Sequence, residues 1–218
     1  MLGMLDEAEK DPRVMRVMSA PYSLNPKSQQ TGPDSAERVS PGFDEDFQQW
    51  TAPFVMGAIN TKVVRRTNAL LGYAYGKEFR YDEAMLMGKG PLGLAKATAA
   101  SAGSAVTMGA MSWGPLRRAV AGRLPQPGDG PDKARREAGY FDLLLRAVGE
   151  DGQVLRGRVK GDRDPGYGST SKMLAESAVC LAQDPEKVGG GIWTPASAMG
   201  QPLLARMPRA GVAFSIEE

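Results

Sequence analysis

Apolar residues recur at helical spacing over residues 2–18, which predicts helix there, with Pro12 as a break or a fresh helix start. Residues 19–46 keep no apolar period and are rich in proline and glycine, which indicates a long connecting loop. We therefore divide the chain into residues 1–50, an N-terminal helix with a long connecting loop, and residues 51–218, a domain of mixed secondary structure.

A second helix is predicted to start at Thr51 and Pro53 and to stop at Gly72. Its apolar positions recur at helical spacing, at Val55, Ile59, Val63 and Leu70. The opposite face carries three cations, namely Lys62, Arg65 and Arg66. These cations favour a solvated face. The alternative is that Arg65, together with Asn60 on the same helix, forms a wall of an active site.

The middle of the chain combines a strand with small-residue helix. Weak alternation over residues 78–87 predicts a strand, and residues 92–111 predict a helix rich in alanine, glycine and serine. After a break at residues 113–115 a short helix is expected up to Leu124. Residues 125–131 have the composition of a linker.

The last third of the chain holds the clearest local signal. Two β-prone runs, residues 140–148 and 154–160, flank a four-residue turn at 149–152, which predicts a β-hairpin. Two helices, over residues 172–183 and from Thr194 to Met207, and a strand over residues 212–216 complete the chain. This order of elements predicts an α+β fold with a mixed or antiparallel sheet.

Composition excludes several kinds of chemistry. The chain has no histidine and a single cysteine, so it can form neither a Ser-His-Asp triad nor an internal disulfide. Cys180 is expected to be a buried, inert thiol, because nothing near it in sequence would lower its pKa. A net charge of +2 argues against a nucleic-acid binder. We expect no metal site.

No segment is a strong candidate for a signal peptide or a membrane span. The N-terminus lacks a basic region and meets an acid at Asp6. The longest uncharged run, residues 97–116, consists mostly of small residues and is weakly hydrophobic. We therefore expect a cytoplasmic protein and leave peripheral membrane contact open.

The glycine pattern at Gly88, Gly90 and Gly93 matches the dinucleotide-binding fingerprint. Three features favour a plain turn at a helix start instead. Pro91 removes one amide that would face a pyrophosphate, the preceding strand is polar, and no acid follows at the spacing of a ribose ligand. We therefore assign no cofactor-binding residues, and the nucleotide site stays the alternative.

A glycine-rich turn before the helix at residues 172–183 is the better site candidate. Free amides and the helix dipole at such an N-terminus favour an anion, and nearby hydroxyls and a lysine add donors. The alternative is a plain helix cap in which a hydroxyl of residues 169–171 accepts from the backbone. The candidate substrate-binding residues are Asp164, Gly166, Tyr167, Gly168, Ser169, Thr170 and Lys172, together with Asn60 and Arg65.

Several segments, taken together and in order, carry a resemblance to a known family. They are residues 50–73, 79–85, 164–178, 194–200 and 209–214. In combination they resemble the C-terminal half of the saccharopine dehydrogenase-like oxidoreductases, a family that includes the bacterial trans-acting enoyl reductases. Full-length members are roughly twice as long and open with a Rossmann domain that holds NADP(H). We expect that no such unit precedes Met1 here.

The resemblance implies that residues 51–218 form the substrate and oligomerisation domain of a two-domain, NADP-dependent oxidoreductase, with the Rossmann domain missing in cis. It implies a small-molecule or lipid-like substrate and a homo-oligomer, most simply a dimer. We expect the isolated chain to be inactive and to bind NADP(H) weakly, and no residue stands out as the catalytic acid. The alternative is a non-enzymatic, self-associating binding module.

Overall fold

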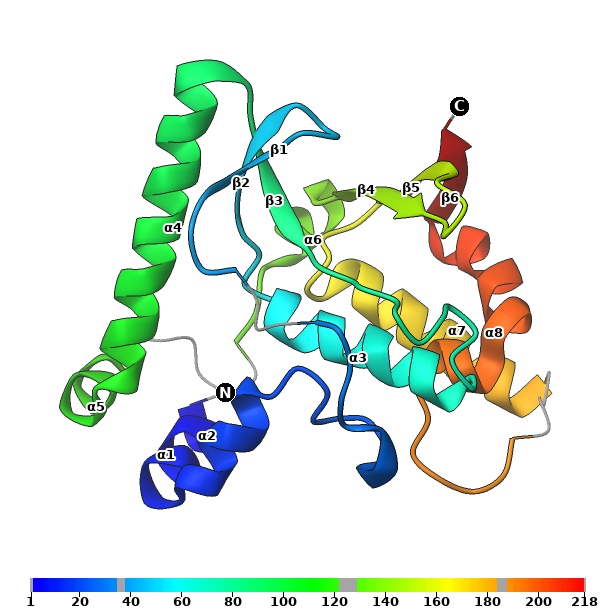
Figure 1. Cartoon of the computed structure of the whole chain (residues 1–218), viewed down its shortest axis with the longest axis horizontal. Helices are drawn as coiled ribbons and strands as arrows, with labels where there is room; N and C mark the ends of the chain where they lie inside the picture. The colour runs from blue at the N-terminus through cyan, green and yellow to red at the C-terminus, as the bar shows by residue number, and fades with distance from the viewer. Residues whose placement is uncertain (1, 35–37, 122–128, 184–187, 218) are drawn as a thin grey trace. The chain divides into compact units, whose positions relative to one another are not determined.

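The computed structural model describes residues 2–34, 38–121, 129–183 and 188–217. Within these residues it combines helices with two antiparallel three-stranded sheets, which confirms the predicted α+β class (Figure 1). The chain forms two compact units, residues 1–124 and 125–218, and each is described by itself. The predicted division at residue 50 stays a prediction.

The first unit begins with the two helices expected around Pro12. They are α1 (Leu2–Lys10) and α2 (Pro12–Ser19), and the Asp11 side chain caps α2 by accepting from the Arg13 amide at 2.9 Å. The predicted loop follows. It contains a short 3₁₀ helix, η1 (Lys27–Gln29), and a short strand, β1 (Gly42–Asp44).

The expected helix start at Thr51 and Pro53 is wrong, because these residues form strand β2 (Gln49–Pro53) and helix α3 (Gly57–Leu70) begins later. Strand β2 lies at the centre of a sheet, between β1 and β3 (Ala84–Gly88). Proline is tolerated where it ends a strand as well as where it starts a helix, and the pairing with β1 and β3 decides the outcome.

The small-residue segment forms α4 (Gly90–Ser112), which lies against β2, and α5 (Gly114–Ala121) follows the predicted break (Figure 1). A Cβ on Gly93 would stand 2.2 Å from the Gly88 carbonyl oxygen, so the strand and the helix meet too closely for any side chain. Strand β3 runs antiparallel to β2, whereas the strands of a dinucleotide-binding unit are parallel. Most of the predicted linker at 125–131 lies outside the described residues.

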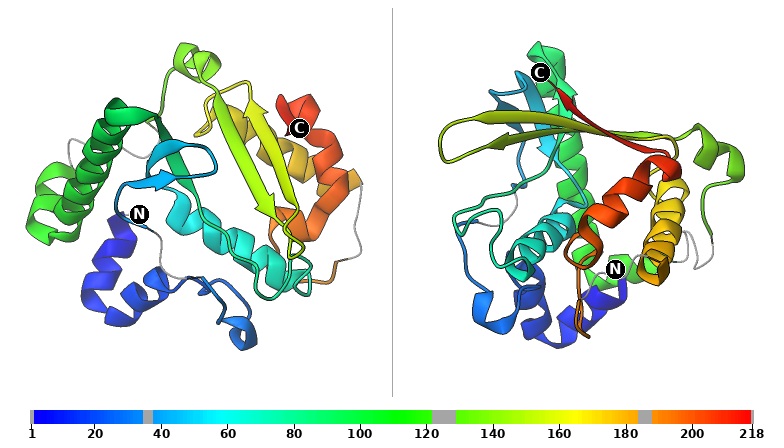
Figure 2. Two further views of the ribbon diagram at one scale, coloured as in Figure 1. Left: turned by 45° about the horizontal axis from the view of Figure 1, so that its top comes forward. Right: turned by 90° about the vertical axis from the view of Figure 1, so that its right-hand side faces the viewer.

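The second unit contains the predicted hairpin, formed by β4 (Phe141–Val148) and β5 (Val154–Gly161). Strand β6 (Val212–Glu217) pairs with β5, so the sheet order is β4-β5-β6 (Figure 2). A short helix that the sequence analysis missed, α6 (Lys133–Ala138), precedes the hairpin.

Two helices and a 3₁₀ turn provide the core of this unit: α7 (Gly168–Gln183), α8 (Pro195–Arg206) and η2 (Met207–Ala210). Cys180 is fully buried against Ala198 and Met199, as expected. A capping box between Thr194 and Ser197 starts α8 at the predicted place. Inside α8 the backbone kinks at Gly200, with φ 41° and ψ −125°.

One face of the second sheet is apolar and exposed. Cross-strand partners place Leu145, Gly157 and Ile216 in one row, and Leu145 and Ile216 remain 41% and 73% exposed. We call this surface the apolar sheet face, made of Leu143, Leu145, Leu155, Phe214 and Ile216. The opposite face carries Arg158, which forms ion pairs with acidic residues on both neighbouring strands.

Candidate functional site

The buried face of α3 is polar rather than apolar. Thr61, Arg65 and Asn68 are buried, whereas the expected apolar residues Val55 and Ile59 are 73% and 52% exposed. The reason is that α3 packs against polar backbone of two long loops instead of an apolar layer, as the bonds of Arg65 and its neighbours show. The prediction of an apolar inner face for this helix is therefore wrong.

Arg65 binds the loop that carries Asp34 to helix α3. Its Nε lies 2.6 Å from Oδ2 of Asp34, and the two side chains are only 4% and 9% exposed. The guanidinium also donates to the Tyr81 carbonyl at 3.0 Å and to Thr61 Oγ1 at 3.3 Å. A solvated position for Arg65 is wrong, and its position gives it a structural role. Direct contact with a substrate stays an untested prediction.

Tyr22, on the same loop as Asp34, contacts both members of this ion pair. The Arg65 guanidinium carbon lies 5.5 Å from the centre of the Tyr22 ring, a cation–π contact. The Asp34 amide donates to the Tyr22 hydroxyl at 3.0 Å. Burial raises the pKa of the Tyr22 phenol above its ordinary value, because the phenolate would lose its hydration.

A carboxylate that the sequence analysis missed lies beside Asn60. The Asn60 Nδ2 donates to Glu83 Oε2 at 2.9 Å, and the Tyr81 hydroxyl donates to Glu83 Oε1 at 2.9 Å. All three side chains are half-buried, whereas Met56, the N-cap of α3, and Ile59, which precedes Asn60, are exposed. We call Asn60, Tyr81 and Glu83 the polar cluster. The only local signal for it was the alternate spacing of Tyr81 and Glu83, which puts two side chains on one side of an extended segment.

Asn68 sets the shape of the loop that leads from α3 to Tyr81 and Glu83 of the polar cluster. Its Nδ2 donates to the Gly76 carbonyl at 2.8 Å, and its Oδ1 accepts from the Tyr75 amide at 2.9 Å. Because Asn68 is buried, these bonds are protected from competing water. Farther along the loop, the ring of Phe79 stacks on Tyr81 with centroids 6.3 Å apart. Phe79 thus contacts the ring of Tyr81, and Glu83 binds its hydroxyl.

The predicted anion site before α7 is occupied by a side chain of the turn itself. The Asp164 carboxylate accepts from the amides of Tyr167 and Gly168 at 2.8 and 2.9 Å. These bonds hold the pKa of Asp164 below its ordinary value, and the bond from the Tyr167 amide has the largest effect. A cap by a hydroxyl is therefore wrong: Ser169 donates to the Arg163 carbonyl and Thr170 to that of Pro165.

Lys172 is also already paired. Its Nζ lies 2.5 Å from Oδ1 of Asp162, and this contact lowers the pKa of the Asp162 carboxyl. An external anion would have to displace Asp164 from the amides or Asp162 from the lysine. Tyr167 and Gly166, in contrast, are exposed on the turn. Substrate contact by this turn is untested and stays a prediction.

The turn leaves no room for side chains at two glycines. A Cβ on Gly168 would lie 2.7 Å from Arg163 Cβ and 2.9 Å from Asp164 Oδ1. A Cβ on Gly211, which follows η2 and has φ 76°, would lie 2.4 Å from the Asp162 carboxylate. The turn therefore joins β5, α7 and η2 at close quarters. Asn60 and Arg65 belong to the first unit and the turn belongs to the second, so the structure describes them separately.

Comparisons with known proteins identify relatives over almost the whole chain. It is 38% identical over 228 residues to a Mycobacterium tuberculosis (strain H37Rv) protein whose name gives trans-acting enoyl reductase as a provisional assignment; 98% of this chain and 54% of that protein align. It is 36% identical over 220 residues to the trans-acting enoyl reductase of Mycobacterium ulcerans, with 95% and 52% aligned. The chain thus spans about half the length of these relatives. No family model and no solved structure matches it.

Among the described residues, no helix is both long and apolar enough to cross a membrane. The longest, α4, is rich in small residues rather than in large apolar ones.

Proposed function

We propose that this chain is the substrate-binding and oligomerisation part of an NADP-dependent enoyl reductase of the saccharopine dehydrogenase-like type. One observation carries the proposal: relatives named trans-acting enoyl reductase align with 94–98% of this chain at 36–38% identity. The simplest interpretation of an alignment of that extent is a shared fold and, with it, a shared role in the reaction. The word trans-acting in those names suggests an enoyl group presented by a separate component.

The residues described here do not fit NADP. The glycine pattern that ends in Gly93 connects β3 to α4, and β3 pairs with β2 in antiparallel rather than parallel direction. Pro91 at the start of α4 has no amide hydrogen to offer a phosphate. We therefore place the nucleotide-binding unit in a further part of the protein, in line with relatives whose length is about half unmatched. In the proposal, this chain binds the enoyl substrate.

The polar cluster is our candidate for the substrate's polar end. Glu83 holds the Tyr81 hydroxyl and the Asn60 amide in fixed orientations, with apolar Met56 and Ile59 exposed beside them. An enoyl thioester combines a carbonyl, which can accept from the second Nδ2 hydrogen of Asn60, with an apolar chain that can lie on the apolar side chains. In this proposal Arg65 acts as a positioning residue. The exposed residues Gly166 and Tyr167 of the turn before α7, which we call the α7 turn, are a second proposed contact surface.

We also propose that the chain forms a homo-oligomer through the apolar sheet face. Two such faces can stack about 10 Å apart, as the sheets of a β-sandwich do, and each would remove the other's exposed leucines from water. The same observation favours the second candidate function, a non-enzymatic module that binds its own copy. Turnover distinguishes the two candidates.

The test joins this chain to the nucleotide-binding half of a trans-acting enoyl reductase and follows NADPH oxidation with a long-chain 2-enoyl thioester. We expect turnover in the joined protein. Glu83→Gln should lower kcat/KM by about tenfold, mainly through KM, because the amide keeps only one accepting oxygen and one of the two oriented donors loses its partner. Glu45→Gln, on an exposed turn of the same unit, is the matched control. A joined protein that binds NADPH but never oxidises it with any enoyl thioester would contradict the proposal.

A further inference from the structure

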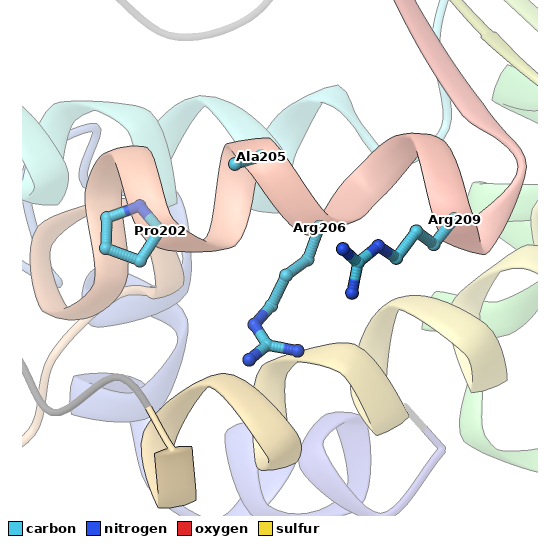
Figure 3. Close-up of a pocket in the computed structure, with 4 residues that line it drawn as sticks. All are labelled: Pro202, Ala205, Arg206 and Arg209. Atoms are coloured by element: carbon cyan, nitrogen blue, oxygen red, sulfur yellow. The ribbon is translucent and has the colours of Figure 1, made fainter.

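A hollow of about 370 Å³ lies along one side of α8 and η2, lined by Pro202, Ala205, Arg206 and Arg209 (Figure 3). The lining residues are spaced i, i+3, i+4 and i+7, which places them on one side of the helical segment formed by α8 and η2. Two of them are small, and this is what leaves space between the two arginines. The hollow lies outside the polar cluster and the α7 turn.

The first arginine is fixed in place by helix α7. Nη1 of Arg206 lies 3.5 Å from Oε2 of Glu176, and Nη2 of Arg206 donates to Oε1 of Gln183 at 3.2 Å. Its side chain is only 14% exposed, so the guanidinium has lost most of its freedom before any ligand arrives. A ligand at this position would therefore bind with a small loss of conformational entropy.

The second arginine has no such partner. Among the residues that the structure describes, the Arg209 guanidinium has neither a hydrogen bond nor an ion pair. Figure 3 shows this group and that of Arg206 reaching into the same space between the helices. Two like charges in one hollow repel each other, and an anion bound between them would relieve that repulsion.

We propose that this hollow binds the phosphate group of a small ligand. Each guanidinium presents a planar fork of N–H donors, so two of them can bind different oxygens of one bound group. A phosphate group has three oxygens that can accept, and it forms bidentate bonds with arginine. Arg206 supplies a fixed fork and Arg209 a mobile one that closes on the bound group. This inference does not rest on the proposed function.

The probe is inorganic phosphate, titrated into the full chain at low salt while the arginine Nε–H signals are followed by NMR. We expect saturable binding in the millimolar range, and Arg209→Gln should weaken it by about tenfold. Arg156→Gln removes the same charge from an exposed position on β5 and should leave binding unchanged, which controls for net charge. Ala205→Leu fills the hollow while keeping both arginines, so it should weaken binding even if Arg209→Gln does not fold.

Two further arms identify the source of the phosphate. Adenosine 5′-monophosphate represents nucleotides, and glycerol 3-phosphate represents lipid headgroups. If one of these two compounds binds more tightly than inorganic phosphate, the ligand belongs to the class that this compound represents. If both bind as inorganic phosphate does, the site recognises the phosphate group alone. Absence of saturable phosphate binding to the unmodified chain would overturn the inference. So would equal binding by the unmodified chain and Ala205→Leu, or an equal loss in Arg156→Gln and Arg209→Gln.

Discussion

Replacing Asp34 by asparagine should destabilise the first unit strongly. The substitution keeps the size of the side chain and removes its charge. The guanidinium of Arg65 then stays buried, at 4% exposure, without an opposite charge at the 2.6 Å contact. An arginine in a protein stays protonated, so it cannot relieve the cost by losing its proton. The helix would have to open or water would have to enter.

The size of the effect follows from the contacts that remain. Removing one partner of a buried ion pair costs about 3–5 kcal/mol. Arg65 would keep its bonds to the Tyr81 carbonyl and to Thr61 Oγ1, which satisfy part of its hydrogen-bonding capacity. We therefore expect a loss near the lower end, about 3 kcal/mol. The double variant Asp34→Asn with Arg65→Met should lose less than the sum of the two single variants.

Urea unfolding followed by tryptophan fluorescence measures this loss. Trp50 and Trp113 lie in the first unit and Trp193 in the second, so a Trp193→Phe background restricts the signal to the first unit. The ion pair between Asp142 and Arg158 on the surface of the second unit is the matched control. Asp142→Asn, followed through Trp193 in a background that keeps it, should barely move the midpoint of that unit. A loss below about 1 kcal/mol for Asp34→Asn would refute the reasoning, since it would place the pair in water.

Three further outcomes are expected in the second unit. Gly168→Ala should lower its melting temperature, with a loss of about 1–3 kcal/mol, because the new methyl collides with Arg163 and Asp164, whereas Gly190→Ala meets open space and should not. The pKa of Asp164 is lowered from 3.8 on folding, so its contribution to stability is complete above that pH and is lost as the pH falls through the lowered pKa; an acid titration of unfolding should show this loss, and Asp164→Asn should remove it. Leu145→Lys, on the apolar sheet face, should shift the chain toward monomer in light scattering, and an unchanged mass would exclude that face as the contact.

Local signals predicted the elements whose hydrogen bonds are local. The hairpin of β4 and β5 closes over a short turn, and the start of α8 depends on Thr194 and Ser197, three residues apart. Strand β2 is different, because its partners β1 and β3 come from separate parts of the chain. A pattern of threonine and proline is compatible with a helix start as well as with a strand end, and only distant pairing separates the two.

The candidate site was harder to predict for the same reason. Arg65 is buried because Asp34 lies 31 positions away in sequence and meets it in space, and no periodicity along α3 encodes that partner. Before α7, several side chains within a few residues could have capped the helix. The backbone geometry of the turn selects Asp164, whose two oxygens reach two successive amides. Sequence predicted where the turn is, and only the structure shows which of its groups remain available.

The central claim is that this chain binds the enoyl substrate and that the nucleotide binds elsewhere in the protein. Calorimetric titration of the isolated chain with NADPH tests it most directly, with a long-chain 2-enoyl thioester titrated in parallel. We predict measurable binding of the thioester, and no NADPH binding tighter than about millimolar, because the turn that would hold the pyrophosphate is absent from the described residues. A micromolar dissociation constant for NADPH would contradict the account and would make Gly88, Gly90 and Gly93 a nucleotide-binding loop after all.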